Sequence, residues 1–123
     1  MTKILIVEDD IYVLKLYGEI FTKEGFEVEL AEDGREAIEK DHEFNPEVML
    51  LDLMLPYIDG FGVLEAIKTN PKTKGIKVIV STNLDSAIQR EKALKLGADV
   101  FLVKSGDTPG NIVSEVKKIL NKN

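Results

Sequence analysis

The sequence predicts an α/β protein built on a doubly wound, five-stranded parallel sheet with five helices. Short apolar runs alternate along the chain with stretches of helical periodicity, so that the order strand then helix occurs five times. The apolar runs are nearly continuous, which is typical of parallel strands that helices cover on both faces. Because crossovers between parallel strands are right-handed, this order places helices on both sides of one sheet.

The expected strands are of two kinds. Four are unbroken apolar runs that we expect to be buried: Ile4-Leu5-Ile6-Val7, Val48-Met49-Leu50-Leu51, Val78-Ile79-Val80 and Val100-Phe101-Leu102-Val103. The fifth segment, residues 26–30, alternates apolar with acidic residues. Alternation leaves one face of a strand in water, so this segment is predicted to lie at an edge of the sheet.

Start and stop signals define five expected helices. The first helix spans roughly Ile11 to Lys23 and ends at Gly25, and the second opens with capping-box spacing at residues 33–36 and turns Ala37 and Ile38 toward the core. The third follows Asp59 with Phe61, Leu64 and Ile67 on its apolar stripe, and the fourth starts after Asp85 and ends at Gly97. The last begins at Thr108-Pro109, and its apolar stripe consists of Ile112, Val113, Val116, Ile119 and Leu120. The fourth helix has the weakest apolar stripe, because positions 89–92 and 95 are polar. Few buried contacts imply low local stability, so this helix is predicted to be the part that moves.

Length and composition narrow the class of protein. The 123 residues fit one domain, residues 1–123, with no second domain predicted, and the lack of cysteine excludes disulfides and thiolate metal sites. The net charge of −6 and the scattered lysines argue against direct nucleic-acid binding. No apolar run is long enough to cross a bilayer or to form a signal-peptide core, so we expect a cytoplasmic protein that does not engage a membrane.

Polar residues stand at the ends of four expected strands. They are Glu8, Asp9 and Asp10 after the first strand, Asp52 after the third, Ser81 and Thr82 at the end of the fourth, and Lys104 after the fifth. In open α/β sheets, ligands bind just outside the carboxyl ends of the strands. Acids, a hydroxyl group and an amine are therefore expected to converge on one rim of the sheet.

Such a set of side chains suits phosphoryl transfer. Carboxylates held close together repel one another unless one takes a proton or a cation joins them, and Mg²⁺ is the hard cation suited to carboxylate oxygens. Phosphoryl transfer needs charge neutralisation and placement more than elaborate covalent chemistry, and an aspartate can be the nucleophile. Lys104 and Thr82 would then supply a charge and a hydrogen bond to the phosphoryl oxygens.

Each of these residues also has a purely structural interpretation. The acids at 8–10 precede a helix, where acids cap the first turn. Asp52 and Lys104 could be a buried structural pair, and Thr82 could be an ordinary residue at a strand end. His42 lies in the charged run of residues 40–43, where a solvated side chain is expected. The functional interpretation therefore depends on all the candidates falling on the same rim.

Together these residues resemble the receiver domain of two-component response regulators over essentially the whole chain. The matching segments are residues 4–10, residues 50–56 with Asp59-Gly60, Thr82, and Gly97-Ala98-Asp99 leading to Lys104. The resemblance implies a flavodoxin-like fold with strand order 2-1-3-4-5. It also implies a phosphoprotein that receives its phosphoryl group from phosphohistidine on a sensor histidine kinase or a histidine phosphotransfer protein, and that signals to a downstream target protein.

The resemblance also implies a role for each site residue. Glu8 and Asp9 match the acid pair that holds Mg²⁺, with Asp52 as the phosphoacceptor and a metal ligand, and Asp10 matches an acid outside the first shell. Met54 matches the position whose backbone carbonyl binds the metal. Thr82 and Lys104 match the phosphoryl-sensing hydroxyl and amine, and Thr82 with Phe101 forms the expected switch. Such a module is no conventional enzyme, although it catalyses its own phosphorylation and slow dephosphorylation.

This chain departs from the family pattern at several positions. Ser105 follows Lys104 where proline is usual, so we expect a trans bond between these two residues. Phe101 replaces a common tyrosine and lacks its hydroxyl group. Asn83 stands where a small residue is usual and would crowd the phosphoryl group. Met54 and Leu84, both apolar, occupy positions that are thought to tune dephosphorylation.

Three other interpretations have to be separated from a working stand-alone receiver. A magnesium phosphatase with an aspartyl nucleophile would need Asp-x-Asp after the first strand, whereas Asp52-Leu53-Met54 lacks the second acid and follows the third. A pseudo-receiver would keep the fold as an interaction module, but here the acid pair, Asp52, Thr82 and Lys104 are all present. The third interpretation is the excised receiver of a longer regulator.

Overall fold

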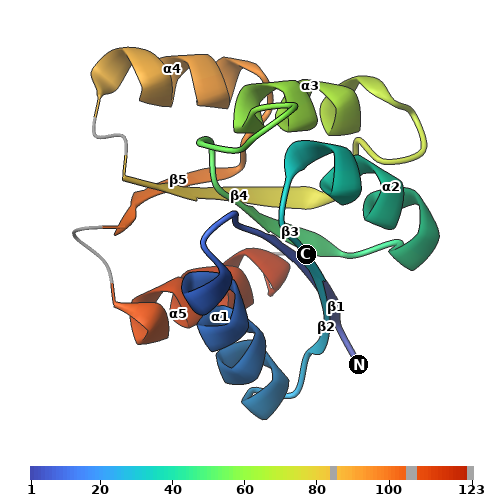
Figure 1. Ribbon diagram of the computed structural model, residues 1–123, viewed down its shortest axis with the longest axis vertical. Helices are drawn as coiled ribbons and strands as arrows, with labels where there is room; N and C mark the ends of the chain where they lie inside the picture. The colour runs from blue at the N-terminus through green and yellow to red at the C-terminus, as the bar shows by residue number, and fades with distance from the viewer. Residues whose placement is uncertain (84–85, 105–107, 122–123) are drawn as a thin grey trace.

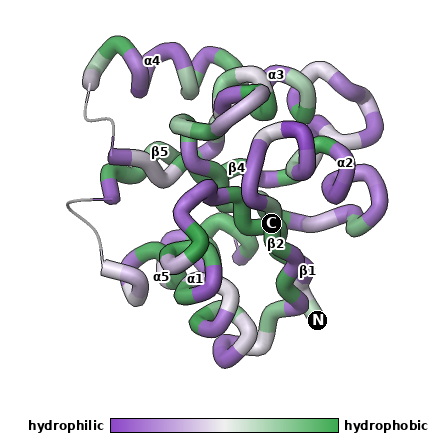
Figure 2. The backbone as a smooth tube through the Cα atoms, viewed as in Figure 1, coloured by the Kyte–Doolittle hydropathy of each residue, from purple (hydrophilic) through white to green (hydrophobic). Residues whose placement is uncertain are grey.

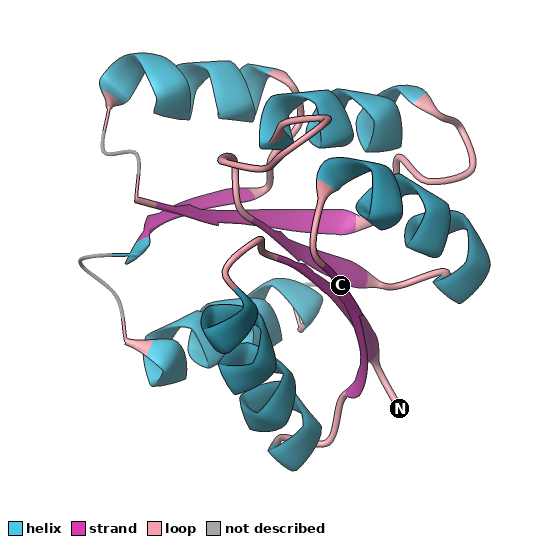
Figure 3. Ribbon diagram, viewed as in Figure 1, coloured by secondary structure: helices cyan, strands magenta, loops and turns pink. Residues whose placement is uncertain are grey.

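The computed structural model describes residues 1–83, 86–104 and 108–121, which fold into three layers with one sheet in the middle (Figure 1 and Figure 3). The strands of the described residues are β1 (Lys3–Val7), β2 (Glu27–Ala31), β3 (Val48–Leu51), β4 (Lys77–Thr82) and β5 (Val100–Val103). They form one parallel sheet in the order β2-β1-β3-β4-β5. The predicted strand order and the predicted edge position of β2 are confirmed.

The helices cover both faces of the sheet. They are α1 (Ile11–Lys23), α2 (Gly34–Phe44), α3 (Gly60–Thr69), α4 (Ala87–Lys95) and α5 (Pro109–Leu120). Helices α1 and α5 lie against one face, and α2, α3 and α4 lie against the other (Figure 1). Side-chain oxygens cap each helix at its N-terminus, from Asp10, Asp33, Asp59, Ser86 and Thr108. The predicted elements are thus confirmed, with small differences at their ends.

The residues at two of these ends make specific contacts. The strand β2 begins and ends one residue later than predicted, because Phe26 packs edge-to-face against Phe21 of α1, with ring centroids 5.2 Å apart, before the strand starts. At the start of α2, Asp33 accepts a hydrogen bond from the Glu36 N–H, as capping-box spacing predicts. The returning Glu36 carboxylate accepts from Glu32 rather than from the cap residue.

Alternate residues of each strand fill two apolar cores, one on each face of the sheet. Leu5, Val7, Met49 and Leu51 point toward α2, α3 and α4, whereas Ile4, Ile6, Val48 and Leu50 point toward α1 and α5. The backbone tube is accordingly apolar along the central strands and largely polar along the outer faces of the helices (Figure 2). This double burial explains why the inner strands are unbroken apolar runs.

Helix α4 is held more weakly than the other helices. Ala93 is the buried residue among the nine that form it, all of them described, and Ile88 is 77% exposed. Two cations of this helix lie over aromatic rings instead: the Arg90 guanidinium is 5.6 Å from the centroid of Phe101, and the Lys92 ammonium is 4.3 Å from that of Phe61. Such contacts contribute about 0.5–1 kcal/mol each at exposed positions, so they hold α4 against the rest of the domain only weakly.

The outer edge of β2 is partly covered by side chains. Glu27 donates its N–H to Thr2 and Ala31 accepts from Glu8, so the backbone groups of the alternate residues, including Leu30, face away from β1. The Lys40 ammonium donates to the outward carbonyl of Leu30 and forms an ion pair with Glu29 at 3.3 Å. A charged side chain thus occupies the position where another strand would pair.

The inner stripe of α2 contains a buried acid. Asp41 lies on the same side as Gly34 and Ala37, is 0% exposed, and has no hydrogen-bond partner for either carboxylate oxygen among the described residues. Burial raises the pKa of Asp41 to about 6, and the charge of His42 opposes this rise. His42 itself is exposed, as predicted, although it directly follows the buried Asp41.

Candidate functional site

The carboxyl ends of the strands bring the predicted site residues to one rim of the sheet. Glu8 and Asp9 follow β1, Asp52 follows β3, Thr82 ends β4 and Lys104 follows β5. The ladder continues just past the strands, since the Asp52 N–H donates to Val7 at 3.1 Å. This bond holds the Asp52 backbone beside the end of β1 and therefore beside Glu8.

Lys104 joins the two buried acids of the rim. Its ammonium contacts the Glu8 carboxylate and lies 3.0 Å from Asp52 Oδ2. Asp52 Oδ1 accepts the backbone N–H of Met54 at 3.2 Å, and Glu8 Oε2 accepts the backbone N–H of Asp10 at 3.2 Å. Both oxygens of each carboxylate are therefore engaged, which orients them and partly repays the cost of their burial.

The close packing of these charges shifts their pKa values. Burial raises the pKa of the Glu8 carboxyl above its ordinary value, and the Asp52 charge adds to the rise while Lys104 opposes it. Burial alone would lower the pKa of Lys104, but the hydrogen bonds and charges of Glu8 and Asp52 outweigh it, so the pKa of this ammonium lies above its ordinary value. Lys104 therefore stays protonated and acts as a fixed positive charge at the rim.

Three carboxylates of the described residues form a set that could hold a metal ion. Oxygens of Glu8, Asp9 and Asp52 lie within 4.8 Å of one another, and Asp9 is the exposed member of the three. An all-oxygen set with one open side suits a hard cation that keeps several waters. Asp10, by contrast, caps α1 by accepting from Tyr12 and Val13, which confirms the capping interpretation for that acid.

The two predicted switch residues lie on neighbouring strands. Thr82 is fully buried at the end of β4 and is paired in register with Val103, immediately before Lys104. Phe101 is 6% exposed, lies opposite Val80 in the ladder and belongs to the core on the α2, α3 and α4 face. Asn83 is exposed. Leu84 and Ser105 lie outside the described residues, and so does the predicted trans bond before Ser105.

Sequence reasoning missed two buried polar residues, Ser81 beside this site and Asp41 in α2. Ser81 was placed at a strand end without a role, yet its hydroxyl group is buried beside Glu8, Asp52 and Lys104. The signal that could have found it is strand alternation, since Ser81 shares the sheet face of Ile79. Asp41 could have been found by continuing the inner helical stripe from Ala37 by four residues.

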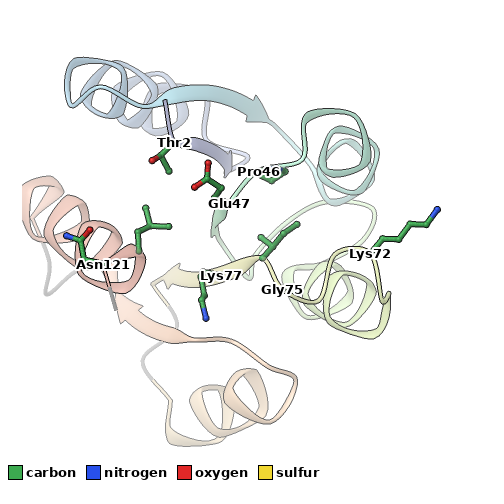
Figure 4. Close-up of a pocket in the computed structure, with 9 residues that line it drawn as sticks. Thr2, Pro46, Glu47, Lys72, Gly75, Lys77 and Asn121 are labelled. Carbon is green, nitrogen blue, oxygen red and sulfur yellow. The ribbon is translucent and has the colours of Figure 1, made fainter. Parts of the chain in front are cut away.

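A hollow of about 450 Å³ lies at the opposite, amino end of the strands (Figure 4). Thr2, Glu47 and Lys77 line it from the ends of β1, β3 and β4, with Lys72 and Asn121 from the surrounding segments. The labelled side chains spread around the hollow rather than converging on one point (Figure 4). The polar side chains that converge on one another are therefore those at the carboxyl ends of the strands.

The fold and the acidic rim define a class of protein, an α/β domain of the flavodoxin-like type with a metal-capable acid cluster at its strand ends. The chain matches the model of the response regulator receiver domain over residues 4–117. It belongs to the response regulator receiver domain family, and it is therefore a receiver domain of two-component response regulators.

Individual relatives agree with this assignment. The chain is 34% identical over 122 residues to a CpxR homolog from Haemophilus influenzae, covering 99% of this chain and 52% of that protein. It is 37% identical over 105 residues to the response regulator PleD of Caulobacter vibrioides, covering 85% of this chain and 23% of that protein. The chain thus spans about half the length, or less, of the curated relatives that it matches.

Solved structures agree in shape as well. A CheY-like receiver domain protein from Methanospirillum hungatei superimposes with a TM-score of 0.92 at 30% identity, covering 99% of this chain and 95% of that one. The CheY in a CheX-CheY-BeF3-Mg complex from Borrelia burgdorferi gives a TM-score of 0.87 at 30% identity, covering 97% and 89%. Among the helices that the structure describes, none combines the length and the apolar character needed to span a bilayer.

Proposed function

We propose that this receiver accepts a phosphoryl group on Asp52 in a Mg²⁺-dependent reaction and passes the signal on by a change of shape. The donor is phosphohistidine on a sensor histidine kinase or a histidine phosphotransfer protein, and a downstream target protein reads the result in the cytoplasm. Receiver domains of response regulators interact with histidine kinases and with downstream effectors, which supports partners of this kind.

The proposed reaction uses the groups of the rim directly. An oxygen of the Asp52 carboxylate attacks the phosphorus atom of the donor, the new O–P bond forms, and the P–N bond of the phosphohistidine breaks with its electron pair returning to the imidazole nitrogen. Lys104, already 3.0 Å from Asp52, neutralises charge on the phosphoryl oxygens. Thr82 adds a hydrogen bond from the end of β4.

The proposed metal site consists of Asp9, Asp52 and the backbone carbonyl of Met54, with Glu8 acting partly through water. A bound Mg²⁺ would neutralise phosphoryl charge beside Asp52. The clustering of Glu8, Asp9 and Asp52 oxygens supports the fit of a hard cation. The related CheX-CheY complex from Borrelia burgdorferi contains BeF3, which resembles a phosphoryl group, together with Mg²⁺.

The observation that carries this proposal is the Lys104 ammonium held between Glu8 and Asp52. A purely structural ion pair would need one acid, whereas here two buried acids contact one ammonium, and an oxygen of the exposed Asp9 lies within 4.8 Å of oxygens of both acids. Excess negative charge at one point is what a metal and a phosphoryl group would resolve together.

Intact mass after treatment with acetyl phosphate and Mg²⁺ tests the reaction. We expect the mass of one added phosphoryl group, lost in Asp52→Ala and retained in Glu39→Gln, a matched control that removes an exposed charge of α2. The adduct should also be absent when Mg²⁺ is removed by chelation, while the fold persists. Equal labelling of Asp52→Ala and the native chain would refute the assignment of the phosphoacceptor.

The metal site has its own measurement. Titration of Mg²⁺ should shift the backbone NMR signals of Asp9, Asp52 and their neighbours. Absence of a response near these residues, with shifts elsewhere, would show that the cation binds at another place.

The output part of the proposal concerns Thr82, Phe101 and α4. Phosphorylation adds nearly two negative charges and three acceptor oxygens beside Thr82, which should draw its hydroxyl group toward Asp52. Phe101 adjusts to the space near the end of β4, and α4 shifts because so little of it is buried. A partner would read the face formed by α4, β5 and α5.

Hydrogen exchange of the beryllofluoride-treated and untreated protein tests this output. We expect altered protection within residues 82–104, including α4, and loss of that change in Thr82→Ala. A response confined to the residues around Asp9 and Asp52 would refute the switch while leaving the phosphoryl chemistry intact.

A further inference from the structure

The hydroxyl group of Ser81 is buried without a hydrogen-bond partner among the described residues. Ser81 is 3% exposed, and its Oγ is out of reach of solvent. A buried hydroxyl group left unpaired costs about 1–3 kcal/mol, so such groups in native proteins are usually satisfied by protein or by an ordered water. The position of Ser81 therefore calls for a partner.

A small cavity adjoins this hydroxyl group. It has a volume of about 10 Å³ and is lined by Ser81, by the charged rim residues Glu8, Asp52 and Lys104, by Tyr17 of α1, and by the strand residues Ile6, Val7, Leu50 and Leu51. This volume is at the lower limit of what one water needs, and a water also needs two to four polar partners. Charged and hydroxyl groups on one wall meet that second condition.

Lys104 supplies the complementary group. An ammonium has three N–H donors, and the described carboxylates of Glu8 and Asp52 account for two of its contacts. Among the described residues the third donor of this nitrogen has no further acceptor, and Lys104 lines the cavity together with Ser81. A water between them would accept from the ammonium and bond to Ser81 Oγ, whereas a cation at the same place would be repelled by the ammonium.

We propose that Ser81 and Lys104 hold a single buried water in this cavity, and that Ser81 thereby acts as a positioning residue for the Lys104 ammonium. The positioning role rests on the proposed phosphorylation of Asp52, whereas the water site does not. When Lys104 turns toward a phosphoryl oxygen, the water and Ser81 keep its remaining hydrogens bonded, so the ammonium moves without breaking all its contacts at once.

The pair Ser81→Thr and Ser81→Val tests the proposal, because the two side chains have the same shape and only threonine keeps the hydroxyl group. The measurement is the rate of phosphorylation by acetyl phosphate, followed by intact mass over a range of donor concentrations with Mg²⁺. We expect Ser81→Val to lower the maximal rate about 3- to 10-fold, the size of one net hydrogen bond, without changing the donor concentration at half-maximal rate. Ser81→Thr should stay within about twofold of the native rate.

A crystal structure of the native protein that resolves ordered waters provides the second arm. We expect density for one water within hydrogen-bond distance of Ser81 Oγ and Lys104 Nζ, and its loss in Ser81→Val. A dry cavity, or a Ser81 hydroxyl group bonded directly to protein, would overturn the water site. Equal slowing of the threonine and valine variants, or none in valine, would overturn the positioning role.

The two arms still decide the proposal if a variant does not fold or if the native chain is not phosphorylated. Ser81→Ala, which only removes atoms, replaces the valine variant if that variant does not fold. Failure of the native chain to be phosphorylated would refute the proposed function, and the crystallographic arm would then decide the water site alone.

Discussion

Replacement of Asp41 by asparagine should stabilise the protein, and the gain should grow as the pH rises. The folded protein holds this carboxyl buried and without a hydrogen-bond partner in the described part of the chain, which raises its pKa to about 6 from an ordinary value of 3.8. Between these two values the folded state binds a proton that the unfolded chain has released. The contribution of the Asp41 carboxyl to stability is therefore fully present only below its ordinary pKa of 3.8, and it is lost as the pH rises through about 6.

The size of the effect follows from the same two values. The gap between about 6 and 3.8 corresponds to about 3 kcal/mol at 1.36 kcal/mol for each tenfold change in an equilibrium. This is a large share of the 5–15 kcal/mol that typically separates folded and unfolded domains, so it should be easy to measure. Asparagine keeps the shape of the side chain and removes its titration.

Urea unfolding of the native chain and of Asp41→Asn from pH 4 to pH 8 measures this difference directly. We expect the difference in the free energy of unfolding to move by about 2.4 kcal/mol in favour of the variant over that range, because the rest of the change falls below pH 4, and to be flat above about pH 7. Asp41→Leu, which also removes the polar group from the apolar stripe, should follow the same pH dependence. Titrating groups that do not interact with Asp41 are present in all three proteins and cancel in the comparison.

A difference that does not change with pH would refute this reasoning. So would a difference that grows as the pH falls, because it would mean that the ionised carboxylate is stabilised in the folded protein by a contact. Glu39→Gln on the exposed side of the same helix is the matched control and should leave the pH dependence unchanged.

Three further predictions concern the packing of single residues. Arg90→Gln should remove the cation over the Phe101 ring and lower the hydrogen-exchange protection of α4 about two- to fivefold, as expected for 0.5–1 kcal/mol. Gly34→Ala should cost about 3 kcal/mol of unfolding free energy in a urea titration, because its Cβ would lie 1.9 Å from the Ile58 carbonyl oxygen. Asp10→Ala should cost about 1 kcal/mol by removing the cap of α1, measured in the same way, while phosphorylation by acetyl phosphate persists.

Each of these predictions has a control on the same kind of element. Ile88→Val changes a side chain of α4 that is 77% exposed and should leave the exchange protection of the helix unaltered. In Gly110→Ala, also in the first turn of a helix, the nearest atom that the added Cβ would meet in the described part of the chain is Thr108 Oγ1 at 3.9 Å, so this change should not destabilise. Asp10→Ser keeps a capping oxygen and should restore stability; loss of phosphorylation in Asp10→Ser would instead indicate a direct role for this acid at the metal site.

Most of the fold was predictable because its signals are local. The apolar runs ending at Val7 and Leu51 report burial on both faces, and caps such as Asp59 and Thr108 mark helix starts within three or four residues. The one-residue displacement of β2 came from a tertiary contact, the packing of Phe26, which no local signal reports.

The candidate site was predictable in position but not in its contacts. Strand ends of a parallel sheet meet at one rim, so the acids, Thr82 and Lys104 could be placed together from their order alone. The contact between Lys104 and Glu8 joins residues 96 positions apart, and which acid the ammonium meets depends on side-chain packing. The buried states of Ser81 and Asp41 needed the facing elements to be known, because a polar residue in a strand or helix has the same local signal whether it is buried or solvated.

The side chain of Lys40 at the outer edge of β2 has a consequence for how copies of this chain behave in concentrated solution. A second molecule approaching this edge would find the Leu30 carbonyl already bonded to an ammonium, and its own Glu27 and Glu29 would approach the same acids across the new pair. Backbone pairing between copies would thus break an ion pair and set like charges against each other. The strand that closes the sheet on this side therefore also opposes its growth into filaments or aggregates.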